Sequence, residues 1–564
     1  MASVAEETLR APTAAAGTSD TAVADGAAAD RRGKLRVALL VDSLTQPRWA
    51  VESFAALAQG DVAEVVAIVT CPGAREEESL LWRAWERMDR RAFGFHPDPL
   101  EPLDVRTHIA HRALVPRAEL RFMTVDVAFV LGQAEPPVPL FARYGLWRHF
   151  FGAGPGDRMA GAAELLAGQT VMPSGIVARP SEGGEERVVY ESWSRLFDYS
   201  LARTRDGQLA KASSYAERAL RSLQRDGADW ISRCPLFSST RAAVDEKAGS
   251  HQSVNALRLV STLGLGTARG VARSLTTQGQ WFIASRLGAT TDWDGDLTSY
   301  QCRLPPADRF WADPFPLARD GRHYIFFEEL PFAAGRAHIA CVEVKADGSW
   351  TQPRKVLERP YHLSYPFLFE HGGALFMVPE TGDRRTVEVY RCRRFPDEWT
   401  LEQVLLEGAF FTDATLHHGE DRWWMFVNRS PEGTQGCDEL SLYHAQEPLG
   451  RWQSHPGNPV KSDVRGARPA GRLFHSGGHL LRPGQIGAPI YGHGVAIHRV
   501  DRLTPQEYRE TEIARVTPLK PRGLLGVHTI NRAGELSVMD GFFRRPRWGS
   551  SSGTPFPTGI AHGH

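Results

Sequence analysis

Residues 412–426, TDATLHHGEDRWWMF, contain the pattern that decides the fold of the C-terminal half. A small or acidic motif is followed by a glycine-type turn and then by an apolar strand. The layout occurs five times, about 50 residues apart, which is slightly more than a four-stranded propeller blade needs. It therefore predicts a five-bladed β-propeller over residues 281–545, with an irregular β-sandwich as the alternative. The equivalent positions are Asp313, Tyr365, Asp413, Ala470 and Gly526.

The N-terminal half has a different pattern. Apolar strands are expected at Leu35–Val41, Ala63–Val69 and Val125–Leu131, with a helix around Trp49–Ala58. Strands that alternate with helices predict a doubly wound parallel α/β domain, here over residues 34–200. A helical linker is expected over 201–280. The Ala-rich segment 1–33 is expected to be disordered and 546–564 to be flexible.

Charge and composition restrict the function. Lys+Arg and Asp+Glu both number 66, so the formal charge is zero, which argues against a nucleic-acid partner. No apolar run is long enough for a transmembrane helix, and no signal sequence is recognisable. The cysteines are scattered without a CxxC pair, as in a reducing compartment. We expect a cytoplasmic protein whose oligomeric state the sequence leaves open.

Candidate catalytic residues follow from the propeller geometry. Equivalent positions in successive blades converge on one axis, so Asp313 and Asp413 should face each other, with Glu380 at the same rim. Paired carboxylates are what general acid/base chemistry at a glycosidic bond requires. The same aspartates can instead cap turns and be structural. Substrate contacts are expected from Tyr365, Arg468, His528 and Glu329, with Glu328 as the alternative to Glu329.

The N-terminal domain contains fewer signals. Asp42 follows the first strand, where α/β folds bind ligands, and His149 and Asp157 lie in a polar, aromatic and glycine-rich cluster. All three are candidate substrate contacts, although a histidine beside aromatic residues is usually a packed one. No GxGxxG, GxSxG, HExxH or P-loop motif occurs.

The propeller motifs resemble the N-terminal domain of plant glucosamine inositolphosphorylceramide transferases. They also resemble arabinanase-like glycosidases, where the position of Asp313 holds the general base, that of Tyr365 a second carboxylate, and that of Asp413 is where a general acid is expected. The first domain resembles formyltransferases, which combine Asn, His and Asp; His149 and Asp157 match two of these. The motifs that carry these resemblances are Ala312-Asp313-Pro314-Phe315, Ser364-Tyr365-Pro366, Val378-Pro379-Glu380-Thr381, Asp413-Ala414-Thr415-Leu416, Arg468-Pro469-Ala470-Gly471, Leu40-Val41-Asp42-Ser43 and Arg143-Tyr144-Gly145-Leu146-Trp147.

Three functions remain open. The first is an enzyme of cell-surface glycan or glycolipid biosynthesis, with its sugar site in the propeller channel. The second is formyl or acyl transfer to an amino sugar by the N-terminal domain, which implies a folate-type carrier. The third is a non-catalytic glycan-binding protein. No motif demands a metal, although Asp and His at a propeller axis can hold Ca²⁺.

Overall fold

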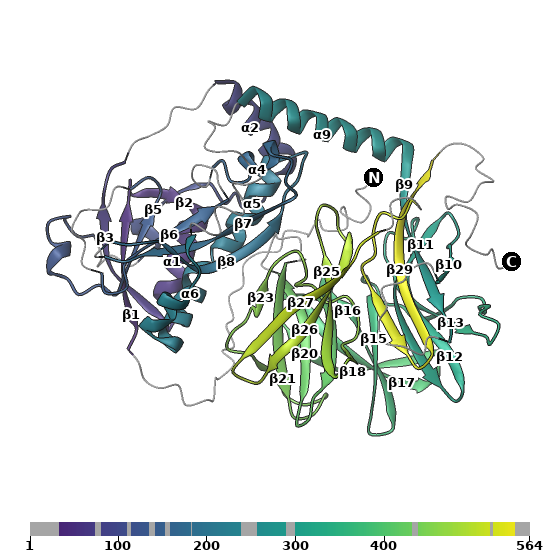
Figure 1. The fold of residues 1–564 in the computed structure, drawn as a ribbon. Helices are drawn as coiled ribbons and strands as arrows, with labels where there is room; N and C mark the ends of the chain where they lie inside the picture. Colours follow the sequence, from purple (N-terminus) through teal and green to yellow (C-terminus); the bar gives the residue numbers. More distant parts are fainter. Residues whose placement is uncertain are drawn as a thin grey trace.

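The chain forms an N-terminal α/β domain and a C-terminal β-propeller, and the long helix α9 (Ala256–Thr276) connects them (Figure 1). The structure is a computed structural model. It describes residues 33–73, 80–109, 114–134, 142–152, 158–181, 183–237, 256–288, 299–430, 438–518 and 523–547.

The N-terminal domain is built on a six-stranded sheet with the order β3-β1-β5-β6-β7-β8. The first four strands are parallel, as expected, whereas β7 and β8 are antiparallel. The expectation of an all-parallel sheet is therefore wrong for β7 and β8, because a short turn joins them as a hairpin instead of a crossover helix. The strands are β1 (Leu35–Val41), β3 (Ala63–Thr70), β5 (Val127–Leu131), β6 (Leu146–Phe151), β7 (Val171–Arg179) and β8 (Arg187–Arg195), and β2 (Thr45–Pro47) pairs separately with β4 (Pro102–Asp104).

The two faces of this sheet are covered differently. Val37, Leu39 and Val41 point into a core shared with α1 (Arg48–Gln59), α5 (Leu201–Ala212) and α6 (Tyr215–Asp226). Alternate side chains such as Leu40 point to the other face, where η2 (Leu120–Phe122) and irregular segments cover them. A doubly wound arrangement is thus not confirmed in the described residues. The remaining helices are α2 (Leu80–Phe93), α3 (Val105–His108), α4 (Ala162–Leu166) and α7 (Ala228–Arg233).

In the described residues the propeller has five antiparallel sheets, four with four strands and one with five, which confirms the predicted five-bladed architecture. The first four blades are β11–β14 (Arg309–Arg319, Arg322–Pro331, His338–Val344, Arg354–Leu357), β15–β18 (Ser364–His371, Ala374–Thr381, Thr386–Arg394, Glu398–Glu407), β19–β22 (Phe410–His418, Trp423–Ser430, Glu439–Ala445, Gln453–Ser454) with β23 (Lys461–Ser462) beside β21, and β24–β27 (Phe474–Ser476, His479–Ile486, Gly494–Leu503, Tyr508–Val516).

The fifth blade joins distant parts of the chain. It pairs β28 (Ile530–Ala533) and β29 (Leu536–Pro546) with β9 (Thr277–Arg286) and β10 (Gln301–Arg303). The contact is long, since β29 and β9 are in register from Ser537↔Arg286 to Pro546↔Thr277. The ring is therefore closed by backbone hydrogen bonds between its first and last strands.

The inner strands of three blades share a kink. Asp313, Tyr365 and Asp413 have φ values of 50°, 45° and 54°, in the left-handed region that residues other than glycine rarely adopt. At each position the pairing to the next strand shifts register, as in a β-bulge. The structural repeat thus has the phase that the sequence repeat predicts. Such strain is concentrated at functional sites in proteins. The three kinked positions therefore indicate where in the propeller a functional site is expected.

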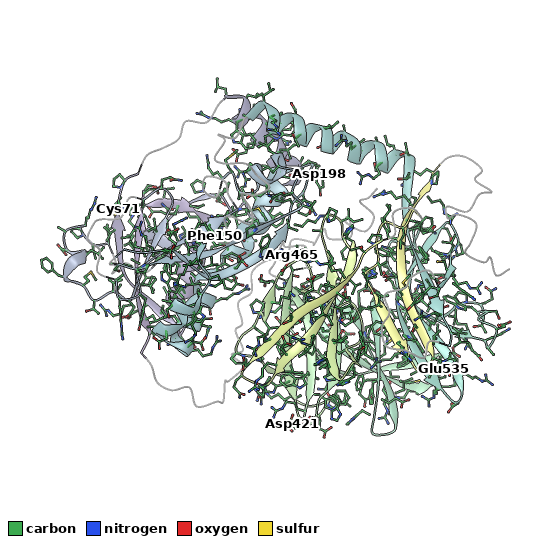
Figure 2. All side chains as sticks on the ribbon, viewed as in Figure 1. Cys71, Phe150, Asp198, Asp421, Arg465 and Glu535 are labelled. Atoms are coloured by element: carbon green, nitrogen blue, oxygen red, sulfur yellow. The ribbon has the colours of Figure 1, made fainter. Side chains whose placement is uncertain are left out.

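The two domains meet through buried ion pairs. Lys211 Nζ lies 2.8 Å from Asp438 Oδ2, and Arg218 lies 2.6 Å from Glu439 Oε1 at the start of β21. Beside them, Arg465, labelled between the domains in Figure 2, stacks on Trp193 of β8 at 3.9 Å. These contacts hold β8, α5 and α6 against the third blade.

Candidate functional site

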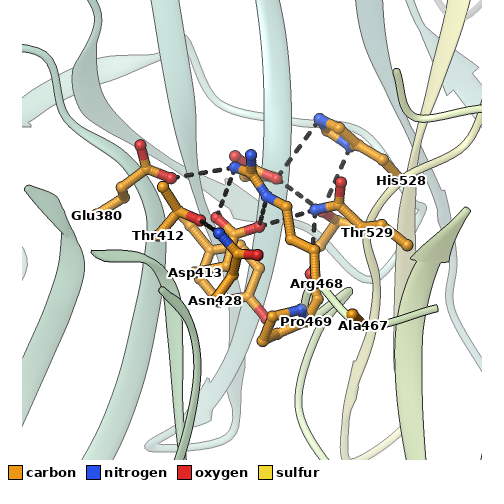
Figure 3. Close-up of polar contacts among 12 residues, drawn as sticks. Glu380, Thr412, Asp413, Asn428, Ala467, Arg468, Pro469, His528 and Thr529 are labelled. Carbon is orange, nitrogen blue, oxygen red and sulfur yellow. Dashed lines mark hydrogen bonds and ion pairs between the residues drawn. The ribbon is translucent and has the colours of Figure 1, made fainter. Parts of the chain in front are cut away.

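Arg468 connects two carboxylates from different blades (Figure 3). Its Nε and one terminal nitrogen donate to both oxygens of Asp413, at 2.6 and 3.1 Å, and the same terminal nitrogen donates to Glu380 Oε2 at 3.2 Å. Gln485 also donates to Asp413, at 2.8 Å. Asp413 is 1% exposed, so its charge is neutralised inside the protein by the guanidinium. Its main role in this arrangement is to hold Arg468.

A second cluster lies around Asp313. Thr529 Oγ1 donates to Asp313 Oδ1 at 2.6 Å, and His528 Nε2 lies 3.8 Å from the same oxygen. On its other side, His528 Nδ1 forms an ion pair with Asp540. The imidazole therefore lies between two carboxylates, Asp313 and Asp540, and Asp540 is held by backbone N–H groups. Figure 3 shows His528 and Thr529 beside Arg468.

Burial and charge set the proton affinities of this cluster. Burial raises the pKa of Asp313 to about 7, against the lowering effect of His528. Burial alone would lower the pKa of His528, but Asp540 and then Asp313 raise it to about 9. Burial also raises the pKa of Glu380, and Asp413 adds to this while Arg468 opposes it. At neutral pH the site therefore combines a protonated imidazole with the carboxyl group of Asp313, whose pKa lies near 7.

Aromatic rings border the same cluster. Trp281 of β9 stacks on His528 with ring centroids 4.0 Å apart. Tyr491, which is 37% exposed, contacts the edge of His528 and lies under the guanidinium of Arg468, 5.3 Å from it. An exposed ring beside buried charged groups suits a sugar ring, which has both apolar faces and hydroxyls.

Some predicted contacts are placed elsewhere. Tyr365 is fully buried, and its hydroxyl oxygen bonds to Thr415 Oγ1 and accepts the Gly471 N–H, so it packs between blades. Glu329 accepts from Trp311 and pairs with His338, away from Asp313. Its neighbour Glu328 is the residue on the Asp313 side, where it pairs with His362. The structure thus brings Asp313, Glu380, Asp413, Arg468 and His528 together but leaves out Tyr365 and Glu329.

Asp540, Trp281 and Tyr491 complete the cluster and were not predicted. The first two come from strands of the closing blade rather than from the repeated position itself, and Tyr491 lies in a loop. The triplet Val538-Met539-Asp540 continues the apolar strand of the fifth repeat, and an acidic residue inside such a strand is a signal that could have indicated Asp540.

A metal ion does not fit the Asp313, His528 and Asp540 group, although atoms of all three lie within 4.8 Å of one another. Asp540 Oδ1 accepts the backbone N–H groups of His528 and Thr529 at 2.8 and 3.0 Å. Its Oδ2 accepts the Asp313 N–H at 3.1 Å and pairs with His528. A carboxylate occupied in this way and a protonated imidazole lack the free lone pairs that a cation requires. The suggestion of Ca²⁺ gains no support from this geometry.

The candidates of the N-terminal domain do not form a comparable cluster. Asp42 accepts from Gln46 Nε2 at 2.6 Å and from the Gln133 N–H at 3.0 Å. His149 lies among aromatic rings, 5.0 Å from Trp49 between centroids, and both its ring nitrogens are shielded from solvent without a hydrogen-bond partner in the described residues. Asp157 lies outside the described residues. The geometry thus assigns His149 to packing against α1.

His149 is expected to lower the free energy of unfolding of the protein at acidic pH, and its replacement should remove this pH dependence. Burial lowers the pKa of His149 from 6.5 to about 3. As the pH falls below about 6.5, this histidine is therefore protonated in the unfolded chain but not in the folded protein, and the free energy of unfolding decreases. His149→Phe removes two unsatisfied nitrogens and is expected to raise the free energy of unfolding by about 1 kcal/mol at neutral pH, and by more at pH 5. Urea unfolding at both pH values measures this. The exposed His479→Phe is the control; a destabilised His149→Phe with unchanged pH dependence would contradict the assignment.

Comparison with known proteins identifies relatives of the propeller. Residues 301–524 match the family model of the N-terminal domain of glucosamine inositolphosphorylceramide transferase 1. The rice enzyme of that name (Oryza sativa subsp. japonica) is 34% identical over 208 residues, which are 36% of this chain and 28% of that protein. The Arabidopsis thaliana enzyme is 31% identical over 207 residues, 36% of this chain and 27% of its own. The chain thus matches little more than a quarter of these relatives' length.

Solved structures give more distant matches. The family 117 glycoside hydrolase Zg3597 of Zobellia galactanivorans is 13% identical, with a TM-score of 0.31, and the match covers 48% of this chain and 91% of that one. An exo-1,5-α-L-arabinanase from a bovine ruminal metagenomic library is 14% identical, with a TM-score of 0.30, and the match covers 45% of this chain and 98% of that one.

The resemblance of the propeller motifs to the plant transferases is confirmed by the sequence matches. Asp313, Glu380, Asp413 and Arg468 lie inside the matched segment, whereas His528 and Asp540 lie beyond it.

Proposed function

We propose that this protein is a carbohydrate-active enzyme of glycolipid or cell-surface glycan biosynthesis, and that the Asp313–Glu380–Arg468–His528 cluster of the propeller holds the sugar. The observation that carries the proposal is that the segment matching the plant glucosamine inositolphosphorylceramide transferases contains three of these four residues. By analogy with those names, the substrate class is an amino sugar together with a phosphorylated lipid acceptor.

The proposed roles follow from the proton affinities. Asp313, whose pKa is raised to about 7, serves as the proton acceptor for an attacking hydroxyl. Glu380, whose pKa burial raises well above its usual value, donates a proton to the leaving oxygen. Arg468 positions Glu380 through its hydrogen bond, and Asp413 in turn fixes Arg468. His528 keeps its charge beside Asp313 and favours the ionised form of that carboxyl group.

Asp313→Asn is expected to lower product formation by about 10²- to 10⁴-fold, because it removes the proton acceptor without a change of shape. The full chain would be incubated with UDP-N-acetylglucosamine and an inositol phospholipid, and the glycosylated lipid measured by mass spectrometry. Wild-type activity should rise as the pH increases through about 7, because Asp313 then loses its proton and can act as the acceptor.

Asp320→Asn is the matched control. Asp320 also has a left-handed φ, of 51°, and follows the same strand, but its side chain is 89% exposed. Full activity of Asp313→Asn, or equal losses in both variants, would refute the catalytic role of Asp313.

Glycan binding without catalysis is the second candidate, and one observation favours it. Asp413, a carboxylate that acid/base chemistry could use, is occupied by Arg468 and Gln485. A thermal shift with the sugar ligand that Asp313→Asn abolishes, in the absence of any product from wild-type protein, would support this candidate instead of the enzyme.

A further inference from the structure

Only the first half of helix α9 packs against the rest of the protein. Its buried residues are Leu259, Leu263 and Gly266, all in the first half, where the helix packs on α2 and α4 of the N-terminal domain. Gly266 is required there, because a Cβ would lie 2.0 Å from the Asp198 carbonyl oxygen. Residues 268–273 are exposed, and the helix crosses open space to β9 (Figure 1).

One exposed face of α9 is apolar. Leu257, Leu265, Val271 and Leu275 are 64%, 50%, 53% and 59% exposed. Spacings of 14 and 4 residues from Leu257 to Val271 and on to Leu275 return to one face of a helix with 3.6 residues per turn. Soluble helices normally turn such a face towards a core. Here the face is turned away from both domains.

The charged side chains of α9 itself are all positive. Residues 256–276 contain three arginines and no acidic residue. Arg269 and Arg273 are exposed, four residues apart, and form no ion pair with any described residue. Arg273 contributes, after burial, to a lowered pKa of Arg544, so its charge is not compensated on that side either.

Helix α2 extends the same kind of surface. It packs beside α9 along one edge of the molecule (Figure 1). Leu80, Leu81 and Met88 are 80%, 50% and 56% exposed, and Arg87 and Arg91 are exposed next to them. The acidic residues of α2, Glu86 and Asp89, are buried on its other side.

The sequence of α9 does not stabilise a free helix in water. Gly264 and Gly270 have open space around them, so no close contact requires glycine there, and each costs about 1 kcal/mol relative to alanine. Without acidic residues the helix also has no internal ion pairs. A partner that covers the apolar face and attracts the arginines would supply what the sequence lacks.

We propose that α9, together with α2, docks the protein flat onto an anionic lipid bilayer. A basic amphipathic helix with a wide apolar face binds in this way, with its apolar side chains at the acyl boundary and its arginines at the headgroups. No helix in the described part of the chain could cross a bilayer. The inference concerns a surface outside the propeller cluster and does not depend on the proposed function.

Vesicle sedimentation of the full chain tests the proposal. Wild-type protein should bind vesicles of two-thirds phosphatidylcholine and one-third phosphatidylglycerol, and bind pure phosphatidylcholine far more weakly. Val271→Asp with Leu275→Asp should weaken binding more than tenfold. Arg269→Gln with Arg273→Gln should weaken it about 25-fold, at about fivefold for each arginine near an anionic surface.

Leu401→Asp is the matched control, because Leu401 is 49% exposed on the outer strand of the second blade. All substitutions are at exposed positions, and circular dichroism would verify that each variant is folded. Equal binding to neutral vesicles, or wild-type binding by the helix variants, would overturn the proposal. A wild-type dimer that the α9 substitutions dissociate would also overturn it, because a second copy would then be what covers the helix.

Discussion

Arg468→Met is expected to destabilise the protein by about 3–5 kcal/mol, because it leaves the buried carboxylate of Asp413 without its cation and also removes the hydrogen bond to Glu380. Asp413 is 1% exposed and cannot recover the lost interaction from water. Gln485 remains as a donor, but an amide does not neutralise a charge. Urea unfolding of the variant, followed by tryptophan fluorescence, measures the loss.

Two further variants distinguish the effect of an unpaired buried charge from that of simply replacing an arginine. Arg422→Met removes an arginine whose partner Asp421 is 66% exposed, in the same blade as Asp413, and should cost less than 1 kcal/mol. Asp413→Asn combined with Arg468→Met should recover part of the loss, because it removes the unpaired charge. If Arg468→Met costs no more than Arg422→Met, the ion network does not stabilise the ring.

Arg218→Met is expected to uncouple the two domains. Arg218 forms a two-pronged pair with Glu439, at 2.6 and 3.0 Å, and Glu439 is 3% exposed. Burial would raise the pKa of Glu439, but Arg218 lowers it overall, so the folded state favours the carboxylate. Loss of Arg218 leaves that charge buried, at a cost of about 3–5 kcal/mol in the contact. In differential scanning calorimetry we expect one unfolding transition to become two.

The control for this prediction lies one turn further along α6. Arg221 pairs with Glu217 and Asp61 but is 45% exposed, so Arg221→Met should change stability by less than 1 kcal/mol and leave a single transition. The depressed pKa of Glu439 gives a second test. Its contribution is present above pH 4.5 and is lost as pH falls further, and Arg218→Met should remove this dependence. A variant that still unfolds in one transition would show that other contacts couple the domains.

The propeller could be predicted because its information is repeated. Five copies of one motif indicate five blades even though each strand is short, and the phase of Asp313, Tyr365 and Asp413 matches the three observed bulges. The α/β domain has no such repetition. An apolar strand such as β7 looks the same whether its neighbour is parallel or antiparallel, so strand direction had to come from the structure. The first part of the segment predicted as a helical linker over 201–280 is broken at Ser213-Ser214 into α5 and α6, where serine hydroxyls bond to the preceding turn.

The residues of the candidate site that occupy repeated positions, or lie beside them, could also be predicted from the sequence. Asp313 and Asp413 converge because repeated positions share an axis, and Arg468 and His528 follow as their neighbours. The choice between Glu328 and Glu329 was not predictable, because a bulge changes which alternate side chain faces inward. Asp540 and Trp281 reach His528 only through the pairing of β29 with β9, and no local pattern indicates a partner so distant in sequence.

The same pairing determines the order in which a growing chain can fold on the ribosome. The N-terminal domain has all its strands once β8 has left the exit tunnel. The propeller, in contrast, must wait, because β9 emerges first and its partner β29 last. β10 follows soon and pairs with one edge of β9, but the edge that pairs with β29 has no partner during the whole of that interval, which is the situation in which chaperones bind nascent chains. The strand pairing that closes the ring in the finished molecule thus leaves one edge of β9 exposed during synthesis.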